Sequence, residues 1–457
     1  MRRTRPISET LASGARLLVE TDASIPLVDV DLVVRGGSVH DPVARDGLAR
    51  LYARLLRRGT KRRALPSARA LGPTSADALD EAIESLGGAL AIDVTTSAIR
   101  FHGSVIRRNL QPFFALISSI LLAPAMRPAD LAFVRREAQA ELVAQLDSDR
   151  WLASRAFRHA LFATHPYGRS NTGTPETLEA ITLRELRAFH EQRLRSGSVV
   201  VAFAGDVTAE SARELVSTYL ADLPRGEAVE LELPEPRSPR GVRVVLVDKP
   251  DRTQTQLFVG TLGARMGERS FYPLLVANTV FGGTFSARLV REVRSERGWS
   301  YSAQSRLYAD RARDAWVAYT HPAVEHVRDC LALELELVQR FVEGGVRARE
   351  VAFAKSYLTK SHAFDRDTAA KRLEPHVEAA LFGLPLGFFE GYPERVAAVE
   401  AEAASAAVRT HLGGPSGRGT DLVVAVLGPR QPLERSLATV PGVSSLHVVP
   451  HAEVAHL

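Results

Sequence analysis

The chain of 457 residues contains a single cysteine, Cys330. One thiol excludes a disulfide within the chain and a structural zinc site built from cysteines. Long apolar runs are also absent. The purely apolar segments, such as residues 199–204 and 422–427, are far shorter than the roughly 18 to 20 residues that a membrane-spanning helix needs. We therefore expect no membrane-spanning helix and no redox chemistry.

Basic residues do not gather in one segment. The chain has 58 Lys and Arg against 53 Asp and Glu, a formal net charge of +5. The arginines are spread along the whole chain, whereas nucleic-acid-binding proteins concentrate them in a patch or an arm. Arg2, Arg3 and Arg5 open the chain, but residues 7–14 are too polar for the apolar part of a secretory signal. The sequence thus argues against a nucleic-acid partner, and a cytoplasmic location is the expectation.

The second half of the chain repeats the order of elements predicted for the first half. Matching patterns are a strand from Gly14 and from Gly241, an alternating strand at 27–35 and 255–262, a glycine-terminated helix at 47–58 and 272–280, a long helix from 129 and from 348, and a buried strand at 199–205 and 422–428. The same order recurs at an offset of about 220 residues. This self-similarity indicates that one α+β domain has been duplicated.

A proline-rich, charged stretch without apolar periodicity, residues 226–240, separates the two halves and is typical of a linker. The sequence therefore predicts an N-terminal domain at 1–225 and a homologous C-terminal domain at 241–457. Strands and helices mix too irregularly for a doubly wound parallel sheet. We expect an α+β fold in which each domain is a mainly antiparallel sheet with helices packed on it.

Short motifs, several of them containing glycine, are found along nearly the whole chain. In the first half they are Gly36-Gly37, Gly47-Leu48-Ala49, Gly59-Thr60 and His165-Pro166-Tyr167-Gly168; in the second half they are Gln254-Thr255-Gln256, Gly282-Gly283 and Ser286-Ala287-Arg288-Leu289. Their order resembles the insulinase/pitrilysin zinc-peptidase superfamily. The resemblance is to its two-domain branch, which includes the mitochondrial processing peptidase subunits and bacterial relatives.

In that family the helix after the first Gly-Leu-Ala carries His-x-x-Glu-His. Two imidazoles at i and i+4 share one helix face and offer neutral nitrogens to zinc, and the glutamate is the general base. The corresponding positions here are Arg50, Ala53 and Arg54. A guanidinium is always protonated and has no lone pair to donate. We therefore predict that this chain binds no metal, and the resemblance implies that zinc is held by a partner subunit.

The family's third ligand, a glutamate on a later helix, corresponds to Glu141. One carboxylate cannot hold catalytic zinc. Glu141 is either a solvated helix position or a partner of Arg50 or Arg54. Arg50, Arg54 and Arg57 likewise form either an ordinary solvated face or, by resemblance, part of the wall of an internal chamber.

Two further segments bear on zinc and on substrate. His321 and His326 differ by about 140° around a helix, so they cannot face one metal. The strand edge on which family enzymes hold peptides usually reads Asn-Ala-x-Thr, whereas here it reads Ala91-Ile92-Asp93-Val94. We expect that the first domain does not bind substrate in the family's usual way.

The resemblance assigns a role to the second domain. Family members place an arginine and a tyrosine, seven residues apart, where they bind and polarise the substrate carbonyl beside zinc. The matching residues are Arg294 and Tyr301. A guanidinium and a phenol hydroxyl are donors suited to a developing oxyanion. These residues are therefore the candidate catalytic contacts, acting in a partner's site.

Three hypotheses follow. In the first, this chain is the non-zinc subunit of a heterodimeric zinc metalloendopeptidase that acts on peptides, with a homologous zinc-bearing chain as partner. In the second, it is a catalytically inactive structural or peptide-holding protein, like the core proteins of respiratory complex III. The third, an active homodimeric peptidase, is disfavoured because Arg50, Ala53 and Arg54 replace the zinc motif.

Overall fold

The computed structural model describes residues 6–61, 74–385 and 387–457, so the N-terminal arginines 2, 3 and 5 lie outside it. The chain divides into two compact units. Unit 1 combines the residues up to Glu141 with Asn171–Leu231 and Phe364–Glu390. Unit 2 combines Leu142–Ser170, Glu232–Ala363 and Gly391–Leu457. The chain thus passes between the units several times, and the predicted boundary at 226–240 stays a prediction.

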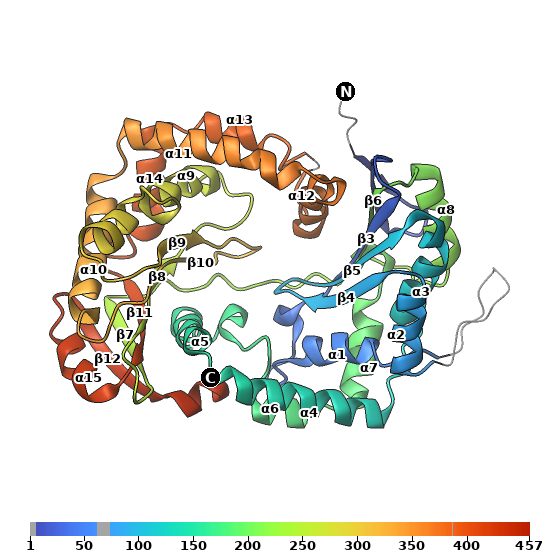
Figure 1. The fold of residues 1–457 in the computed structure, drawn as a ribbon, viewed down its shortest axis with the longest axis horizontal. Coiled ribbons are helices and arrows are strands. Elements are labelled where there is room, and N and C mark those ends of the chain that lie inside the picture. Colours follow the sequence, from blue (N-terminus) through green and yellow to red (C-terminus); the bar gives the residue numbers. More distant parts are fainter. Residues whose placement is uncertain (1–5, 62–73, 386) are drawn as a thin grey trace. The chain divides into compact units, whose positions relative to one another are not determined.

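Unit 1 contains a six-stranded sheet in the order β1-β2-β6-β3-β5-β4 (Figure 1). Its strands are β1 (Ile7–Thr10), β2 (Arg16–Thr21), β3 (Leu27–Arg35), β4 (Ala89–Val94), β5 (Ala98–Ile106) and β6 (Val199–Gly205). The helices are α1 (Leu48–Leu56), α2 (Ala76–Ser85), α3 (Leu110–Leu122), α6 (Pro175–Ala180), α7 (Leu183–Arg193), α8 (Ala209–Tyr219) and α12 (Ala369–Phe382). Helix α4 (Pro128–Gln145) belongs to this unit up to Glu141.

Unit 2 contains a second six-stranded sheet in the order β12-β7-β11-β8-β10-β9. Its strands are β7 (Val242–Asp248), β8 (Gln256–Leu262), β9 (Ala303–Leu307), β10 (Ala315–Thr320), β11 (Leu422–Gly428) and β12 (Val443–Pro450). The helices are α5 (Asp149–Phe162), α9 (Phe271–Gly282), α10 (Val327–Gly344), α11 (Ala348–Ser361), α13 (Tyr392–Ala397), α14 (Ala401–Leu412) and α15 (Arg430–Ala438).

The two sheets share five strands in the same order and direction. In unit 1, β2 is parallel to β6, and β6-β3-β5-β4 are successively antiparallel. In unit 2, β7 is parallel to β11, and β11-β8-β10-β9 are successively antiparallel. The outer strands differ, since β1 is antiparallel to β2 whereas β12 is parallel to β7. The predicted α+β class, with two homologous and mainly antiparallel sheets, is confirmed.

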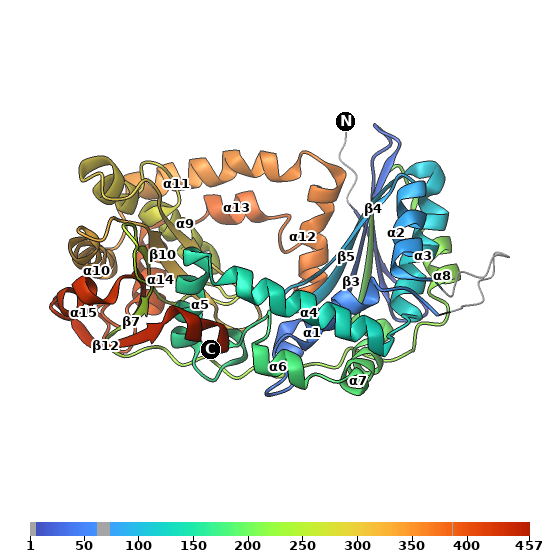
Figure 2. The same ribbon diagram turned by 60° about the horizontal axis from the view of Figure 1, so that its bottom comes forward.

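Each sheet is covered on one face by a helix from the other half of the sequence. Helix α12 packs on β2 and β6 of unit 1, and α5 packs on β7, β8 and β11 of unit 2. Figure 2 shows α12 on one side of the unit 1 sheet and α2, α3 and α8 on the other. The sequence pattern of α5 and α12 does not reveal on which sheet each helix packs, because both read as ordinary amphipathic segments.

Small side chains let α12 lie close to the sheet. Buried Ala202 and Ala204 of β6 and Val33 of β3 meet Leu373 and Val377 of α12 in one apolar cluster. Burial of this surface stabilises the unit in proportion to the apolar area removed from water. The α12 side of the sheet is therefore part of the core of unit 1 wherever the helix covers it.

An ion pair fixes the docked helix. Arg372 of α12 donates to Glu20 at 2.7 Å and to Asp22 at 2.8 Å. Hydrogen bonds from Ser24 and from Arg372 lower the pKa of Asp22 to about 2. Both carboxylates lie at the end of β2 or just beyond it, so Arg372 ties the first turn of α12 to that strand.

None of the helices that the structure describes combines the length and the apolarity needed to cross a membrane.

Candidate functional site

Helix α1 begins at a sharp backbone turn. Gly47 has φ +88°, and a Cβ at this position would come within 2.8 Å of the Gly173 backbone. Only glycine accepts both conditions at low cost. The buried carboxylate of Asp41 accepts hydrogen bonds from the backbone N–H groups of Gly47 at 2.9 Å and Ala49 at 2.8 Å. These contacts satisfy orphan donors of the first turn and fix where the face carrying residues 50 and 54 points.

Arg50 and Arg54 of α1 converge on one carboxylate, Glu141 of α4. Arg50 Nη2 donates to Glu141 Oε1 at 2.5 Å, and Arg54 Nη2 donates to Glu141 Oε2. Burial lowers the pKa of Arg50, and the charge of Arg54 lowers it further, while Glu141 and Asp93 act in the opposite direction. Pairing, and not simple solvation, is the role that the structure gives Glu141.

The donor set at this position does not fit zinc. Arg50 and Arg54 bring positive charge and no lone pairs, and both oxygens of Glu141 already accept guanidinium hydrogen bonds. Ala53, only 2% exposed, has no carboxylate to serve as a base. Within the ranges that the structure describes, no group of three or more His, Cys, Asp or Glu side chains is arranged to hold a metal ion.

The rest of the predicted arginine stripe also meets acidic partners. Arg57 donates to Asp80 of α2, and the neighbouring Arg58 lies 3.7 Å from Asp130 of α4. The opposite face of α1 is buried, with Leu51, Leu55 and Leu56 at 1% exposure or less. The stripe is therefore a set of ion pairs that link α1 to its neighbours. Its place on a chamber wall stays a prediction.

The segment Ala91-Ile92-Asp93-Val94 lies in β4, the outer strand of the unit 1 sheet. Among the described strands, β4 pairs with β5 alone. The role expected for this segment, a strand edge that does not hold substrate in the family's usual way, stays a prediction.

Unit 2 brings Arg294 and Tyr301 together. Arg294 lies on a π-helical segment, Val290–Glu296, held by the buried side chains of Val290 and Val293. Its guanidinium carbon is 4.8 Å from the ring centroid of Tyr301 and 5.1 Å from that of Phe285, within the range of a cation–π contact. Tyr301 is 80% exposed and Phe285 is 81% exposed. Within the described chain, neither the Arg294 guanidinium nor the Tyr301 hydroxyl has a hydrogen-bonded partner, so both donors are available to a ligand.

A pocket of about 460 Å³ adjoins this pair. It is lined by Gly282, Gly283, Phe285, Tyr357 and residues 302–306, as well as by Arg294 and Tyr301 themselves. Residues 303–307 form β9, the outer strand of the unit 2 sheet, and β10 is the one described strand with which it pairs. The pocket therefore combines aromatic side chains with a strand edge and two hydrogen-bond donors.

His321 and His326 have separate surroundings. His321 Nε2 accepts a hydrogen bond from the Ser302 backbone N–H at 3.3 Å. His326, at the start of α10, stacks on Trp299 with ring centroids 5.9 Å apart. Both side chains thus have local structural partners.

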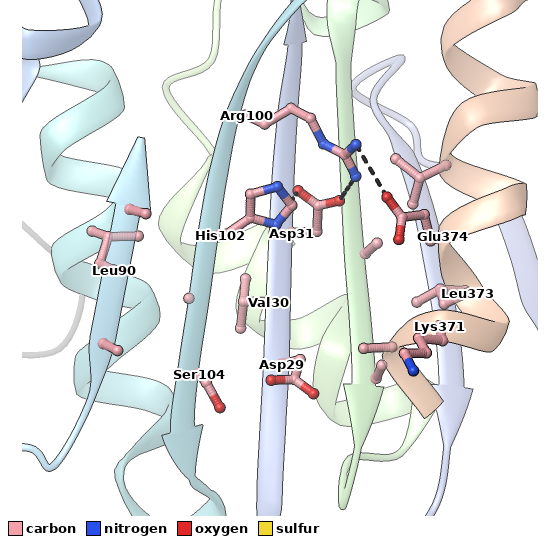
Figure 3. Close-up of a pocket in the computed structure, with 17 residues that line it drawn as sticks. Asp29, Val30, Asp31, Leu90, Arg100, His102, Ser104, Lys371, Leu373 and Glu374 are labelled. Carbon is pink, nitrogen blue, oxygen red and sulfur yellow. Dashed lines mark hydrogen bonds and ion pairs between the residues drawn. The ribbon is translucent and has the colours of Figure 1, made fainter. Parts of the chain in front are cut away.

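Sequence reasoning missed one polar pocket in unit 1, which contains Asp29, Asp31, Arg100 and His102 (Figure 3). The available signal was Asp-x-Asp inside the strand pattern at residues 27–35. Aspartate is depleted in strands, and two aspartates on one face of a strand mark a local conflict that is common at functional sites.

The sequence matches two models of one protein family and several bacterial proteins. The model described as "Insulinase (Peptidase family M16)" matches residues 16–175, and the model described as "Peptidase M16 inactive domain" matches residues 180–358. The non-peptidase homolog YmxG of Helicobacter pylori is 23% identical over 373 residues, which are 81% of this chain and 83% of that protein. An uncharacterized zinc protease of Mycobacterium tuberculosis is 26% identical over 378 residues, 80% of this chain and 82% of the relative.

Solved structures share the fold. The peptidase M16 inactive domain from Pseudomonas fluorescens superposes with a TM-score of 0.83 at 23% identity, covering 93% of this chain and 98% of that one. A chain of complex III2 from Candida albicans gives a TM-score of 0.73 at 17% identity, covering 94% and 98%. Because the two family models together match residues 16–175 and 180–358, well over half of the sequence, the chain belongs to peptidase family M16.

Proposed function

We propose that this chain is the non-zinc subunit of a heterodimeric zinc metalloendopeptidase that acts on peptides in the cytoplasm. A homologous partner supplies zinc, the zinc ligands and the general base. This chain supplies Arg294 and Tyr301 to the partner's active site.

The availability of the Arg294 guanidinium and the Tyr301 hydroxyl is the observation that carries the proposal. Both donors are free of hydrogen bonds within the described chain, and Tyr301 is largely exposed. Phe285 and Tyr301 are both largely exposed beside the Arg294 guanidinium, and an exposed apolar patch of this kind is typical of an interaction site. A substrate carbonyl that gains negative charge during hydrolysis would accept hydrogen bonds from both groups.

The arginines of α1 support the assignment of zinc and the general base to the partner chain. Because Arg50 and Arg54 occupy the two imidazole positions and share Glu141, helix α1 offers no site at which zinc could activate water. The finding fits an inactive member of family M16. Hydrolysis would then require a second chain with an intact His-x-x-Glu-His helix.

A structural or peptide-holding role is the second candidate. It is favoured by the similarity to a relative named a non-peptidase homolog and to a complex III chain. In that role the pocket beside Tyr301 would bind peptide without cleavage. Peptidase activity of the assembled heterodimer separates the two candidates.

The test is to purify this chain and a relative from the same genome that carries His-x-x-Glu-His, alone and mixed. Zinc content and cleavage of a quenched peptide library are measured in each sample. We expect a stable complex in which cleavage exceeds that of either chain alone. Tyr301→Phe and Arg294→Ala should each reduce kcat of the mixture by roughly 100-fold, the usual cost of losing one oxyanion donor.

Tyr308→Phe and Arg291→Ala are matched controls. Tyr308 is 42% exposed in the same unit, and Arg291 lies on the same π-helical segment with a side chain 57% exposed. Both variants should leave kcat unchanged. Activity of the mixture that is indifferent to Tyr301→Phe and Arg294→Ala, or a complex without activity, would favour the peptide-holding role.

A further inference from the structure

A pocket of about 430 Å³ lies within unit 1, between α12 and the part of the sheet that α12 leaves uncovered (Figure 3). We call it the β3–β5 pocket, after the strands that supply its polar residues. Its volume lies in the usual range of small-molecule sites. The zinc-helix positions 50, 53, 54 and 141 do not line it.

Two neighbouring rungs of the sheet form the floor of the β3–β5 pocket. In each rung an aspartate of the central strand β3 lies between an alanine of β6 and a polar residue of β5. The rungs are Ala204–Asp29–Ser104 and Ala202–Asp31–His102. Because side chains two residues apart on a strand share one face, the two carboxylates start about 7 Å apart. The alanines leave open space beside both.

The balance of charge around the pocket is negative. Arg100 is the central cation, and it donates to Asp31 at 2.6 Å, to Glu378 at 2.9 Å and to Glu374 at 3.4 Å. One guanidinium thus faces three carboxylates. Lys371 also lines the pocket, but its ammonium pairs with Asp367 at 3.0 Å and with the Phe364 carbonyl. Asp29 adds a further negative charge that no described cation offsets.

Several polar atoms in the pocket lack partners within the described chain. Asp29 and Ser104 make no side-chain hydrogen bond or ion pair there. Asp31 Oδ1 is buried without a hydrogen bond, and His102 Nδ1 lies 3.5 Å from it. A buried acceptor is nearly always satisfied, so Asp31 Oδ1, together with the unpaired acceptors of Asp29 and Ser104 beside it, indicates a missing hydrogen-bond donor.

The walls beside these groups are apolar. Leu90 of β4 and Leu373 and Val377 of α12 line the pocket, as do Ala89 and Ala91. A ligand therefore meets hydrocarbon along its sides and carboxylates at its charged end. A metal ion does not match this arrangement, because the described residues hold no cluster of three or more metal-binding side chains.

We propose that the β3–β5 pocket binds a primary alkylammonium group, with the methylene chain along the apolar wall and the NH₃⁺ group between Asp29 and Asp31. An ammonium has three N–H donors and is compact. The two carboxylates and the Ser104 hydroxyl offer three acceptors. A lysine side chain of a peptide and a free diamine share this chemistry.

The inference does not depend on the proposed peptidase function. Its test measures binding to this chain alone, whereas the proposed function is tested by cleavage in a mixture of two chains. Failure of one therefore leaves the other in place.

The experiment is isothermal titration of the full chain with three probes: acetyl-Gly-Lys-Gly-amide, its norleucine analogue and 1,5-diaminopentane. We expect the lysine peptide to bind at least about tenfold more tightly than the norleucine peptide, since only the former carries the charge. Comparable binding of the diamine identifies a free amine as a sufficient ligand, whereas binding of the lysine peptide alone identifies a peptide side chain. Either result supports the alkylammonium site.

Two variants test the location. Asp29→Asn removes one charge without breaking a described contact and should weaken binding about tenfold. Ala89→Leu narrows the apolar wall at an exposed position and should weaken binding with all charges kept. Asp77→Asn, at an exposed site on α2, is the matched control and should leave the affinity unchanged. Equal affinity for lysine and norleucine peptides, no binding of any probe, or full affinity in a folded Asp29→Asn variant would overturn the proposal.

Discussion

Glu141 accepts a hydrogen bond of 2.5 Å from Arg50, a residue that lies 91 positions earlier in the chain and on a different helix. Arg54 donates to the second oxygen of the same carboxylate. Glu141 is thus the anion of a charged cross-link between α1 and α4.

The cross-link should contribute to stability. In Glu141→Gln, two guanidiniums with side chains 32% and 28% exposed would face each other without a carboxylate. We expect the free energy of unfolding to fall by about 1 to 2 kcal/mol, the cost of leaving partly buried charges unpaired after allowing for solvent. Urea denaturation measures the change. Glu137→Gln, at an exposed position on the same helix, should stay within about 0.5 kcal/mol; equal effects of the two variants would refute the cross-link.

Zinc binding should be recoverable at this site. Because Glu141 reaches both residue 50 and residue 54, Arg50→His combined with Arg54→His would place two imidazoles and one carboxylate around one point. We expect about one equivalent of zinc by elemental analysis and a Tm that rises with added zinc. The same double variant carrying Glu141→Gln should bind much less. Equal zinc uptake with and without Glu141→Gln would show that the three positions do not form a site.

A buried carboxylate in unit 2 should make stability depend on pH. Glu334 of α10 is fully buried, and burial raises its pKa from 4.5 to about 7, although Thr320 donates to it at 2.6 Å. The folded state therefore keeps a proton that the unfolded state releases. The free energy of unfolding should decrease as pH rises from 4.5 to about 7, with a contribution of roughly 3 kcal/mol.

The isosteric variant Glu334→Gln isolates this contribution. It cannot ionise, so the difference in unfolding free energy between Glu334→Gln and the parent chain should grow in favour of the variant as pH increases. Chemical denaturation at about pH 5, 6, 7 and 8 measures this difference in unfolding free energy as a function of pH. Glu336→Gln, with a side chain 59% exposed on the same helix, should show no such trend. A pH-independent difference for Glu334→Gln would contradict the prediction.

The docking of α12 should depend on Arg372. In Arg372→Ala, Glu20, which is 7% exposed, would lose its guanidinium partner. We expect a loss of about 3 kcal/mol in unfolding free energy, typical of an uncompensated buried charge. Amide exchange in residues 369–382 should also accelerate. As a control, Arg409→Ala breaks a surface pair whose side chains are 47% and 86% exposed and should cost less than about 0.5 kcal/mol. Unchanged exchange in α12 would mean that apolar packing alone holds the helix.

The architecture was largely predictable from the sequence. Alternating apolar residues and glycine-terminated runs placed the strands at 27–35 and 199–205, where β3 and β6 lie. Recurrence of the same order in the second half predicted the second sheet. Such patterns are local, because side-chain periodicity along a strand or helix reports which face is buried.

The pairing of distant segments was not predictable in the same way. The contacts of Arg50 and Arg54 with Glu141, and of Arg100 with Glu374 and Glu378, join residues that no local pattern relates. The Asp-x-Asp of β3 was visible, but its meaning required the neighbouring strands and α12. Charged residues at such positions satisfy the same helix or strand pattern whether they face water or a partner.

The sequence alone determined that α1 cannot hold zinc, because the valence and charge of arginine do not depend on the fold. It also determined the class of the fold, because apolar periodicity can be recognised in the sequence without knowledge of distant contacts. Only the tertiary structure decided which carboxylate neutralises the arginines, which helix covers each sheet and where Asp29 and Asp31 meet open space. Those features depend on residues brought together from far apart in the chain, where burial and Coulomb energy are set by three-dimensional distance.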